Sequence, residues 1–325
     1  MLLESKVTEM QVYLIVNPKS GKGLKVFKKF QEKLTIPYTS YLTEYPSHAT
    51  KLTKKIKREN PNALVVVIGG DGTINEVVNG AANSNLTIGV VSSGSGNDFA
   101  RHFYTFKSPN EIEHFVQEQT VGSADIGQIR FNQEQILFIN NSGIGFDALI
   151  CERVRRSKLK QLLNKLGLGK LVYVYYVLLE LFRFKPFQLQ VETDSGKQVY
   201  RDVWFVAASN QPYFGGGMKI SPHSNAEDGV LEYTIVHRLK RLRFIMIFWK
   251  VFKGNHLKYT EYVEQVKGIS FHASTDKGLF GHVDGEVFSV QSNQQLDFSV
   301  SEFRLKRVTE NYSNEIEYAE QSKII

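Results

Sequence analysis

The first third of the chain alternates between apolar runs and segments with helical periodicity. In 48–59, for example, Ala49, Leu52 and Ile56 share one helical face. The apolar runs predict four strands, at 12–18, 38–44, 63–70 and 87–92. Strands that alternate with helices predict a parallel sheet covered by helices on both faces.

After Gly122 the pattern changes to short strand-like runs that follow one another. They lie at 128–131, 135–140, 187–193, 197–209, 229–236, 268–273, 286–290 and 295–300. Such a succession is typical of an antiparallel β-sandwich or barrel. Helical insertions interrupt it near 152–182 and 239–253. The predicted fold class is α/β plus all-β, with a parallel α/β domain first and an antiparallel β-sandwich with helical insertions second.

Composition adds limits to this picture. A length of 325 residues fits two domains, and 40 Lys and Arg against 33 Asp and Glu give a net charge of +7. The single cysteine, Cys151, excludes an internal disulfide and fits a reducing compartment. The N-terminus lacks the features of a signal peptide, and the longest apolar run, 171–182, is too short to span a membrane. We therefore expect a cytoplasmic protein, or one bound to a membrane surface.

A glycine-rich loop follows the third strand, where Gly69, Gly70 and Gly72 surround Asp71. Glycines let a backbone turn sharply and approach an anion closely. Thr73 and Glu76 have the spacing of a capping box, which predicts a helix start that points free N–H groups at phosphate. A carboxylate repels phosphate unless a cation lies between them, so Asp71 predicts Mg²⁺. The alternative is a turn residue with a purely structural role.

Two further loops follow strands at the same expected edge of the sheet. The segment 17–23 contains Lys19 and Lys22 but lacks the spacing of a P-loop. The segment 92–101 contains a third glycine-rich turn and a second acid, Asp98. Ligands of parallel sheets bind at the carboxyl ends of strands, so three such loops predict a nucleotide site.

Seven motifs occur in an order that resembles the bacterial diacylglycerol and lipid kinase family, from about Val12 to Arg307. They are NPKSGKG, GGDGTINEVVNG, GSGNDFAR, ADIG, FINNSGIGFDA, GGGMKISPHSNAEDGVLEYTIV and HVDGE. The resemblance implies a phosphofructokinase-like, ATP-binding α/β domain over 8–127 and a β-sandwich lipid domain over 128–298. It also implies that the segment 299–312 returns to complete the first domain.

The resemblance also implies which residues carry the site. The expected ATP contacts are Asn17, Ser20, Thr43, Gly69, Gly70, Asp71, Gly72, Thr73, Asn75, Ser93, Gly94, Ser95 and Asn97. The expected acidic network that holds catalytic Mg²⁺ through water is Asp71, Asp98 and Asp125. A structural Mg²⁺ is expected from the Asp228 carboxylate with the backbone carbonyls of Asn225 and Val230. Ser95 departs from the usual threonine of its motif but keeps a hydroxyl.

The general base is expected in VDGE, with Asp284 first and Glu286 second. In a strand, this i, i+2 spacing would point both carboxylates to one face. The alternative is a D-G-E hairpin turn. The implied reaction is the attack of a lipid hydroxyl on the γ-phosphorus of ATP, which depends mostly on positioning and on charge stabilisation.

Diacylglycerol is the first expected substrate, in phospholipid metabolism, with sphingoid bases and phosphatidylglycerol as alternatives. Two basic insertions predict peripheral binding to an anionic membrane, at its inner face. In the first, Leu159, Leu162, Leu163 and Leu166 have helical spacing beside Arg153, Arg155, Arg156, Lys158, Lys160, Lys165 and Lys170. The alternative is that both insertions pack on the sandwich. No nucleic-acid motif accompanies the basic residues, and exposed edge strands predict a homodimer.

Two other functions fit the sequence less well. NAD kinase shares the G-G-D-G-T loop but lacks the G-N-D-F-A-R motif and the basic insertions. A non-catalytic lipid-binding regulator is disfavoured because the expected acids are all present.

Overall fold

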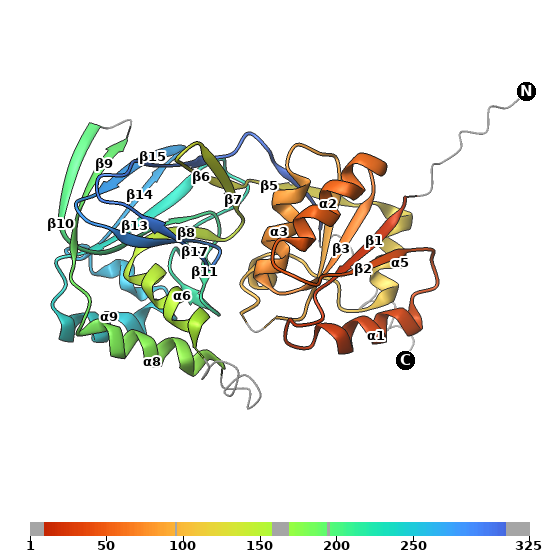
Figure 1. Cartoon of the computed structure of the whole chain (residues 1–325), viewed down its shortest axis with the longest axis horizontal. Coiled ribbons are helices and arrows are strands. Elements are labelled where there is room, and N and C mark those ends of the chain that lie inside the picture. The colour runs from red at the N-terminus through yellow and green to blue at the C-terminus, as the bar shows by residue number, and fades with distance from the viewer. Residues whose placement is uncertain (1–9, 95, 158–168, 194–195, 310–325) are drawn as a thin grey trace, which may run out of the picture.

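The computed structural model of the chain describes residues 10–94, 96–157, 169–193 and 196–309, without the side chains of 169–171. Ser95 and the predicted amphipathic leucines between 159 and 166 therefore lie outside the described residues. Figure 1 shows an α/β part and a β part joined side by side. No helix among the described residues is long and apolar enough to cross a membrane.

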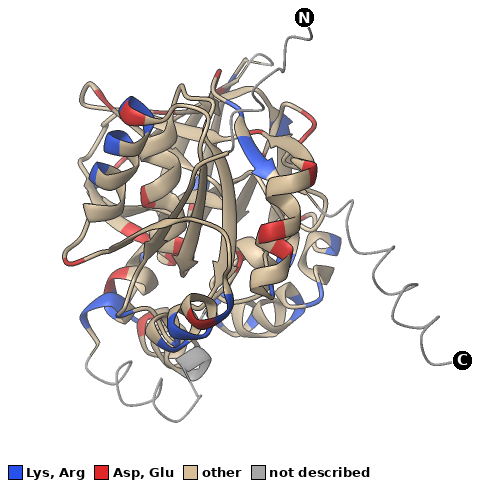
Figure 2. Cartoon of the chain, turned by 90° about the vertical axis from the view of Figure 1, so that its right-hand side faces the viewer, with Lys and Arg blue, Asp and Glu red and all other residues tan. Residues whose placement is uncertain are grey.

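The α/β part alternates strands and helices as the pattern predicts. Its elements are β1 (Val12–Val16), α1 (Gly23–Lys33), β2 (Thr39–Leu42), α2 (His48–Glu59), β3 (Leu64–Gly69), α3 (Asp71–Ala81), β4 (Thr87–Ser92), α4 (Phe99–His102), α5 (Pro109–Glu118) and β5 (Val121–Ala124). Helices cover both faces of the sheet (Figure 2). Because side chains alternate along a strand, Leu14 packs with Phe30 of α1 on one face, and Ile15 packs with Val77 of α3 on the other.

The last described strand, β19 (Leu305–Val308), lies in this same sheet. It pairs parallel to β4 and antiparallel to β5, so that the described strands follow the order β2-β1-β3-β4-β19-β5. The chain therefore leaves the α/β part after β5 and returns to it after the β part.

The β part begins with the strands β6 (Gly127–Phe131), β7 (Glu134–Phe138) and β8 (Asn141–Gly145). The helices α6 (Phe146–Arg156) and α8 (Gly169–Leu181) follow, then β9 (Phe187–Thr193), β10 (Gly196–Ser209), β11 (Tyr213–Phe214), β12 (Met218–Lys219) and β13 (Leu231–His237). The helix α9 (Arg241–Val251) and the 3₁₀ turn η1 (Asn255–Lys258) precede β14 (Val263–Gly268), β15 (Ser270–Thr275), β16 (Leu279–Val283), β17 (Glu286–Val290) and β18 (Leu296–Val300).

The strand β10 joins the two halves of the antiparallel sheet. Its first half pairs with β9, and its second half pairs with both β8 and β13. Its register shifts between Tyr200 and Val203, where Asp202 has a positive φ of 54°. Such an irregularity bends a strand, which lets one strand belong to two layers of a folded sheet. The predicted fold class is confirmed.

The helices α6, α8 and α9 lie together against one side of this sheet (Figure 1). Phe146 of α6 and Phe244 of α9 pack edge to face, with ring centroids 5.3 Å apart. Three arginines of the first predicted membrane insertion form ion pairs within these helices. Arg153 pairs with Glu180 at 2.9 Å, and Arg155 and Arg156 both pair with Glu152.

Candidate active site

Three loops meet at the carboxyl ends of β1, β3 and β4. The Asn17 amide donates to Thr73 Oγ1 at 3.0 Å, and the hydroxyls of Ser20 and Ser93 lie 3.0 Å apart. The N–H of Lys22 donates to the carbonyl of Ser93 at 3.1 Å. These predicted ATP contacts therefore lie together. Thr43 follows β2 at the same end of the sheet, and its N–H donates to the carbonyl of Val16 at 2.8 Å.

Glycine is required where two of these loops touch. A Cβ on Gly94 would lie 2.6 Å from the Cα of Gly70, closer than real Cβ contacts come. Because the contact involves the backbones of both loops, neither loop could move easily to relieve it. The first turn of α3, whose first N–H groups have no partner within the helix, begins at this contact. The positive end of a helix there favours an anion such as phosphate.

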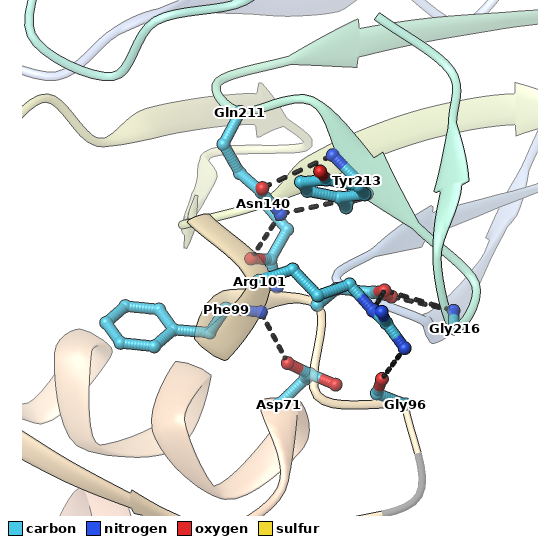
Figure 3. A network of polar contacts seen from close by, with 9 residues as sticks. Asp71, Gly96, Phe99, Arg101, Asn140, Gln211, Tyr213 and Gly216 are labelled. Carbon is cyan, nitrogen blue, oxygen red and sulfur yellow. Dashed lines mark hydrogen bonds and ion pairs between the residues drawn. The ribbon is translucent and has the colours of Figure 1, made fainter. Parts of the chain in front are cut away.

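Two carboxylates, those of Asp71 and Asp98, lie near this helix start, and Figure 3 labels Asp71 with its partner Phe99. Asp71 Oδ1 accepts the N–H of Phe99 at 3.0 Å, and Asp98 accepts the N–H of Gly216 at 2.9 Å. A Cβ on Gly96 would lie 2.9 Å from Asp71 Oδ2 and 3.9 Å from Asp98 Oδ2. Burial and, next, the charge of Asp71 raise the pKa of Asp98 to about 6.

This pair fits a magnesium ion held through water. The charge of Asp71 adds to the cost of ionising Asp98, and a cation beside the pair would reduce this cost. Mg²⁺ commonly binds one or two carboxylates together with substrate phosphates. Sequence reasoning missed Arg101 as part of this site. Its Nη2 lies 3.5 Å from the carbonyl of Gly96, and its Nε lies 3.6 Å from Asp98 Oδ1 (Figure 3).

Asp125, the third predicted member of the acidic network, contacts two other segments. Its Oδ2 accepts the N–H of Gly229 at 2.7 Å, and its Oδ1 pairs with Arg304 at 3.2 Å. It follows β5, and β19 lies between β5 and β4. No group of three or more His, Cys, Asp or Glu in the described part of the chain could hold a metal. A network that holds Mg²⁺ through water, with Asp125 as a member, stays a prediction.

The loop expected to bind a structural metal closes on itself. Asp228 Oδ1 accepts the N–H of Val230 at 3.2 Å, and the carbonyl of Asn225 accepts the N–H of Asp228 at 3.4 Å. The Asp228 carboxylate and the Asn225 carbonyl, two of the expected metal ligands, thus accept hydrogen bonds within the loop. These bonds neither require nor exclude a cation, so this metal site stays a prediction.

The sequence D-G-E forms a hairpin turn between β16 and β17. Val283 pairs with Glu286 across it, and Asp284 and Gly285 have positive φ angles of 47° and 90°. This is the two-residue turn that favours Asp-Gly. The hairpin-turn alternative is therefore confirmed, and the reading in which Asp284 and Glu286 share a strand face is wrong.

Asp284 is hydrogen-bonded on both carboxylate oxygens. Oδ1 accepts the N–H groups of Asn140 and Asn141, and Oδ2 accepts the N–H of Ile139 and the amide of Asn75, at distances of 2.8 to 3.0 Å. Burial raises the pKa of Asp284, and these four donors act against the rise. Asn75 is a predicted ATP contact, but its side-chain NH₂ group donates to Asp284 and to the carbonyl of Leu137, both in the β part.

Glu286 has the opposite surroundings. It is exposed, and its carboxylate makes no hydrogen bond or ion pair with the described residues. Its Oε1 lies 3.8 Å from the position that a Cβ on Gly72 would take, at the start of α3. The β part thus presents a free carboxylate to the glycine-rich loop.

The predicted capping box is also wrong. α3 begins at Asp71, with Gly70 as its N-cap, so Thr73 lies inside the first turn. Glu76 accepts the N–H of Ser47 at 2.8 Å and that of Ala49 at 3.0 Å, and so satisfies the start of α2. Asn97, another expected ATP contact, has a positive φ of 54° and a buried Oδ1 without a partner among the described residues.

An apolar cavity of about 70 Å³ lies in the β part, between the sheet and the helices. Its wall includes Tyr173 and Val177 of α8 and Phe244 and Phe248 of α9. Burial raises the pKa of Tyr173 well above its usual value, and Cys151, Asp147 and Asp98 add to this. A Cβ on Gly215 would lie 3.7 Å from Cζ of Tyr173, and the N–H of the next residue, Gly216, donates to Asp98 at 2.9 Å. The cavity therefore lies close to a carboxylate of the α/β part.

Comparisons with known proteins agree with this geometry. Residues 11–129 match the "Diacylglycerol kinase catalytic domain", and residues 141–296 match the "YegS C-terminal NAD kinase beta sandwich-like domain". The chain is 34% identical over 308 residues to "Putative lipid kinase YtlR" of Bacillus subtilis (strain 168), which covers 90% of this chain and 98% of that protein. The chain belongs to the diacylglycerol kinase family. This family member is an ATP-dependent kinase.

Other relatives of this kinase are more distant. A diacylglycerol kinase of Mycobacterium tuberculosis is 27% identical over 224 residues, with 68% of this chain and 70% of that protein covered. The structure of a diacylglycerol kinase from Bacillus anthracis aligns with a TM-score of 0.64 at 21% identity and covers 94% of this chain and 99% of that one. An NAD kinase from Archaeoglobus fulgidus, in complex with ATP, aligns with a TM-score of 0.52 at 14% identity and covers 97% and 100%. These two likenesses concern the fold.

Proposed function

We propose that this kinase transfers the γ-phosphate of ATP to the hydroxyl of a membrane lipid, with diacylglycerol as the first substrate to test. The proposal rests on one observation above the others. A free carboxylate, Glu286, faces the phosphate-binding start of α3 from a domain that contains an apolar cavity. The names of several relatives point to the same acceptor.

Different residues would bind phosphate, hold Mg²⁺ and accept the proton. The N–H groups at the start of α3 bind phosphate, and Asp71 and Asp98 would hold Mg²⁺, which neutralises phosphate charge when bound. The lipid hydroxyl must lose its proton as it attacks phosphorus. Glu286 is the preferred acceptor of that proton, because Asp284 already accepts four hydrogen bonds.

The apolar cavity is the proposed site for the lipid chain. At about 70 Å³ it has room for a few water molecules and not for an acyl chain. Binding would therefore require α8 or α9 to move outward from the sheet.

The outer surface of α9 is the proposed contact with the membrane. Leu242, Met246 and Trp249 are 75%, 62% and 52% exposed, and exposed apolar groups of this size mark interaction sites. Lys240, Lys250 and Lys253 are exposed around them, which suits an anionic lipid surface. The kinase would then act as a peripheral protein at the inner face of the membrane.

A panel of acceptors tests the proposal. Labelled γ-phosphate would be offered with Mg²⁺ to diacylglycerol, sphingosine and phosphatidylglycerol in mixed micelles, with NAD as a soluble control. A labelled lipid is the expected product. Labelled NADP, or ATP binding without any labelled lipid, would overturn the proposal, and the second result would favour a non-catalytic lipid-binding regulator.

A further inference from the structure

Arg101 lies beside the carboxylates of the candidate active site and makes only long contacts there. Its Nε lies 3.6 Å from Asp98 Oδ1, and its Nη2 lies 3.5 Å from the carbonyl oxygen of Gly96 (Figure 3). Both distances exceed those of ordinary hydrogen bonds. The side chain is 35% exposed and makes no other hydrogen bond or ion pair with the described residues. Because a guanidinium has five N–H donors, most of those of Arg101 are free for a ligand.

The turn between β11 and β12 holds this arginine in position from the β part. A Cβ on Gly217 would lie 3.1 Å from Cζ of Arg101, and Gly217 has a positive φ of 109°. The N–H of the preceding residue, Gly216, donates to Asp98 at 2.9 Å. The turn therefore packs on the guanidinium and on the neighbouring carboxylate together, and glycine at 217 leaves room for the guanidinium.

The guanidinium lies near the helix start that is proposed to bind phosphate. A Cβ on Gly96, whose carbonyl Arg101 contacts, would lie 2.9 Å from Asp71 Oδ2. Asp71 is the first residue of α3, where the unpaired N–H groups of the helix lie. Arg101 and these N–H groups thus flank the same carboxylate.

The charges of the site leave a need for such a cation. Burial and, next, the charge of Asp71 raise the pKa of Asp98 to about 6, and the opposing charge of Arg101 does not cancel them. The two charges of a Mg²⁺ ion held by Asp71 and Asp98 would be balanced by these two carboxylates. Much of the negative charge of the ATP phosphates would therefore need another positive group.

We propose that Arg101 donates hydrogen bonds to the γ-phosphate of ATP and stabilises its charge during transfer. This inference rests on the proposed function. As the lipid oxygen bonds to the γ-phosphorus, the bond to the bridging oxygen of ADP breaks and the lipid proton passes to Glu286. Negative charge spreads over the oxygens of the phosphoryl group in this transition state, and a guanidinium fork matches them in geometry and in charge.

The first test compares Arg101→Met with Arg101→Lys on the best lipid acceptor. Methionine removes the charge, so we expect kcat to fall about 100-fold or more, with the affinity for ATP within about threefold of the wild type. Lysine keeps the charge without the fork and should recover part of the loss. Arg58→Met, the control, removes an exposed arginine of α2 and should keep the wild-type kcat.

Chemical rescue separates this role from a structural one. Arg101→Ala leaves space for a free guanidinium ion, which should raise the kcat of this variant at least about tenfold and leave the wild type and Arg58→Met unchanged. If Arg101 only positioned Asp98 and the β11–β12 turn, saturating Mg²⁺ would restore the kcat of the variants and guanidinium would have no effect. That result would overturn the inference.

The release of phosphate from ATP to water provides a readout without lipid. The same bond to the bridging oxygen breaks, so Arg101→Met should slow this release by a similar factor. Equal release by the wild type and Arg101→Met would overturn the inference. A wild type that releases phosphate but labels no lipid would contradict the proposed function, and the two release rates would still decide the role of Arg101.

Discussion

Two carboxylates of one turn, Asp284 and Glu286, have different surroundings although they are two residues apart. Asp284 accepts four hydrogen bonds from segments of both parts of the molecule, whereas Glu286 is exposed beside the phosphate-binding loop. The sequence predicted that the base lies in this segment. Asp284 was ranked first there and Glu286 second, but spacing could not test this order, because it depends on backbone N–H groups from 139–141 that only the fold brings near.

Asp284→Asn should lower the stability of the folded chain. The amide would turn an NH₂ group toward backbone donors, and each buried group left unsatisfied costs about 1–3 kcal/mol. We expect a clear fall in the free energy of unfolding, measured with urea. Glu286→Gln, at an exposed site, is the matched control and should stay within about 0.5 kcal/mol of the wild type. Equal stability of both variants would contradict the structural role of Asp284.

The neutral ring of His256 makes stability depend on pH. Burial lowers the pKa of His256 in the folded chain, so protonation favours the unfolded chain. Its contribution to stability is complete above the unfolded pKa of about 6.5 and is lost as the pH falls through the lower, folded value. Between pH 7 and pH 5, His256→Gln should therefore lose less stability than the wild type. Parallel losses in urea unfolding would argue against a buried neutral ring.

At the scale of elements, periodicity predicted the strongly patterned segments and missed the polar ones. The apolar runs of β1, β3 and β4 were predicted, since parallel strands are buried on both faces. β8, with the sequence NSGIG, and β14, with VEQVKG, were missed because neither alternates in hydrophobicity. The capping box failed because Glu76 satisfies a neighbouring helix, a tertiary contact that local spacing does not contain.

The outer face of α9 carries a prediction about membranes. Replacing Leu242 and Met246 together with serine should weaken binding to vesicles of phosphatidylcholine and phosphatidylglycerol about tenfold or more, because less apolar surface enters the bilayer. Cosedimentation measures the effect. Ile269→Ser is the control, since Ile269 is 62% exposed, as Met246 is, but lies between β14 and β15. Equal binding of both variants would rule out α9 as the docking surface.

At the scale of the molecule, the chain crosses between its two parts twice and places the site between them. The sequence predicted two parts, and the resemblance implied a returning segment near 299–312. The place of β19 between β4 and β5 was not predictable from spacing, because the chain returns to this sheet only after the β part. Asp125 joins the two parts through Arg304 and Gly229.

The return strand should be essential for folding of the first part. A chain that ends at Ser301 lacks β19 and leaves the facing edges of β4 and β5 unpaired, which favours aggregation. We expect loss of soluble protein, compared by soluble yield with a chain that ends at Thr309 and keeps β19. A soluble shorter chain with the same unfolding midpoint would contradict this role.

The most direct test of the central claim is the rate of γ-phosphate transfer by the wild type and Glu286→Gln on the best lipid acceptor, with ATP affinity measured beside it. We expect the variant to bind ATP as the wild type does but to transfer phosphate at least about 100-fold more slowly, because the lipid hydroxyl has lost its proton acceptor. A variant that phosphorylates the lipid at the wild-type rate would show that Glu286 is not the base.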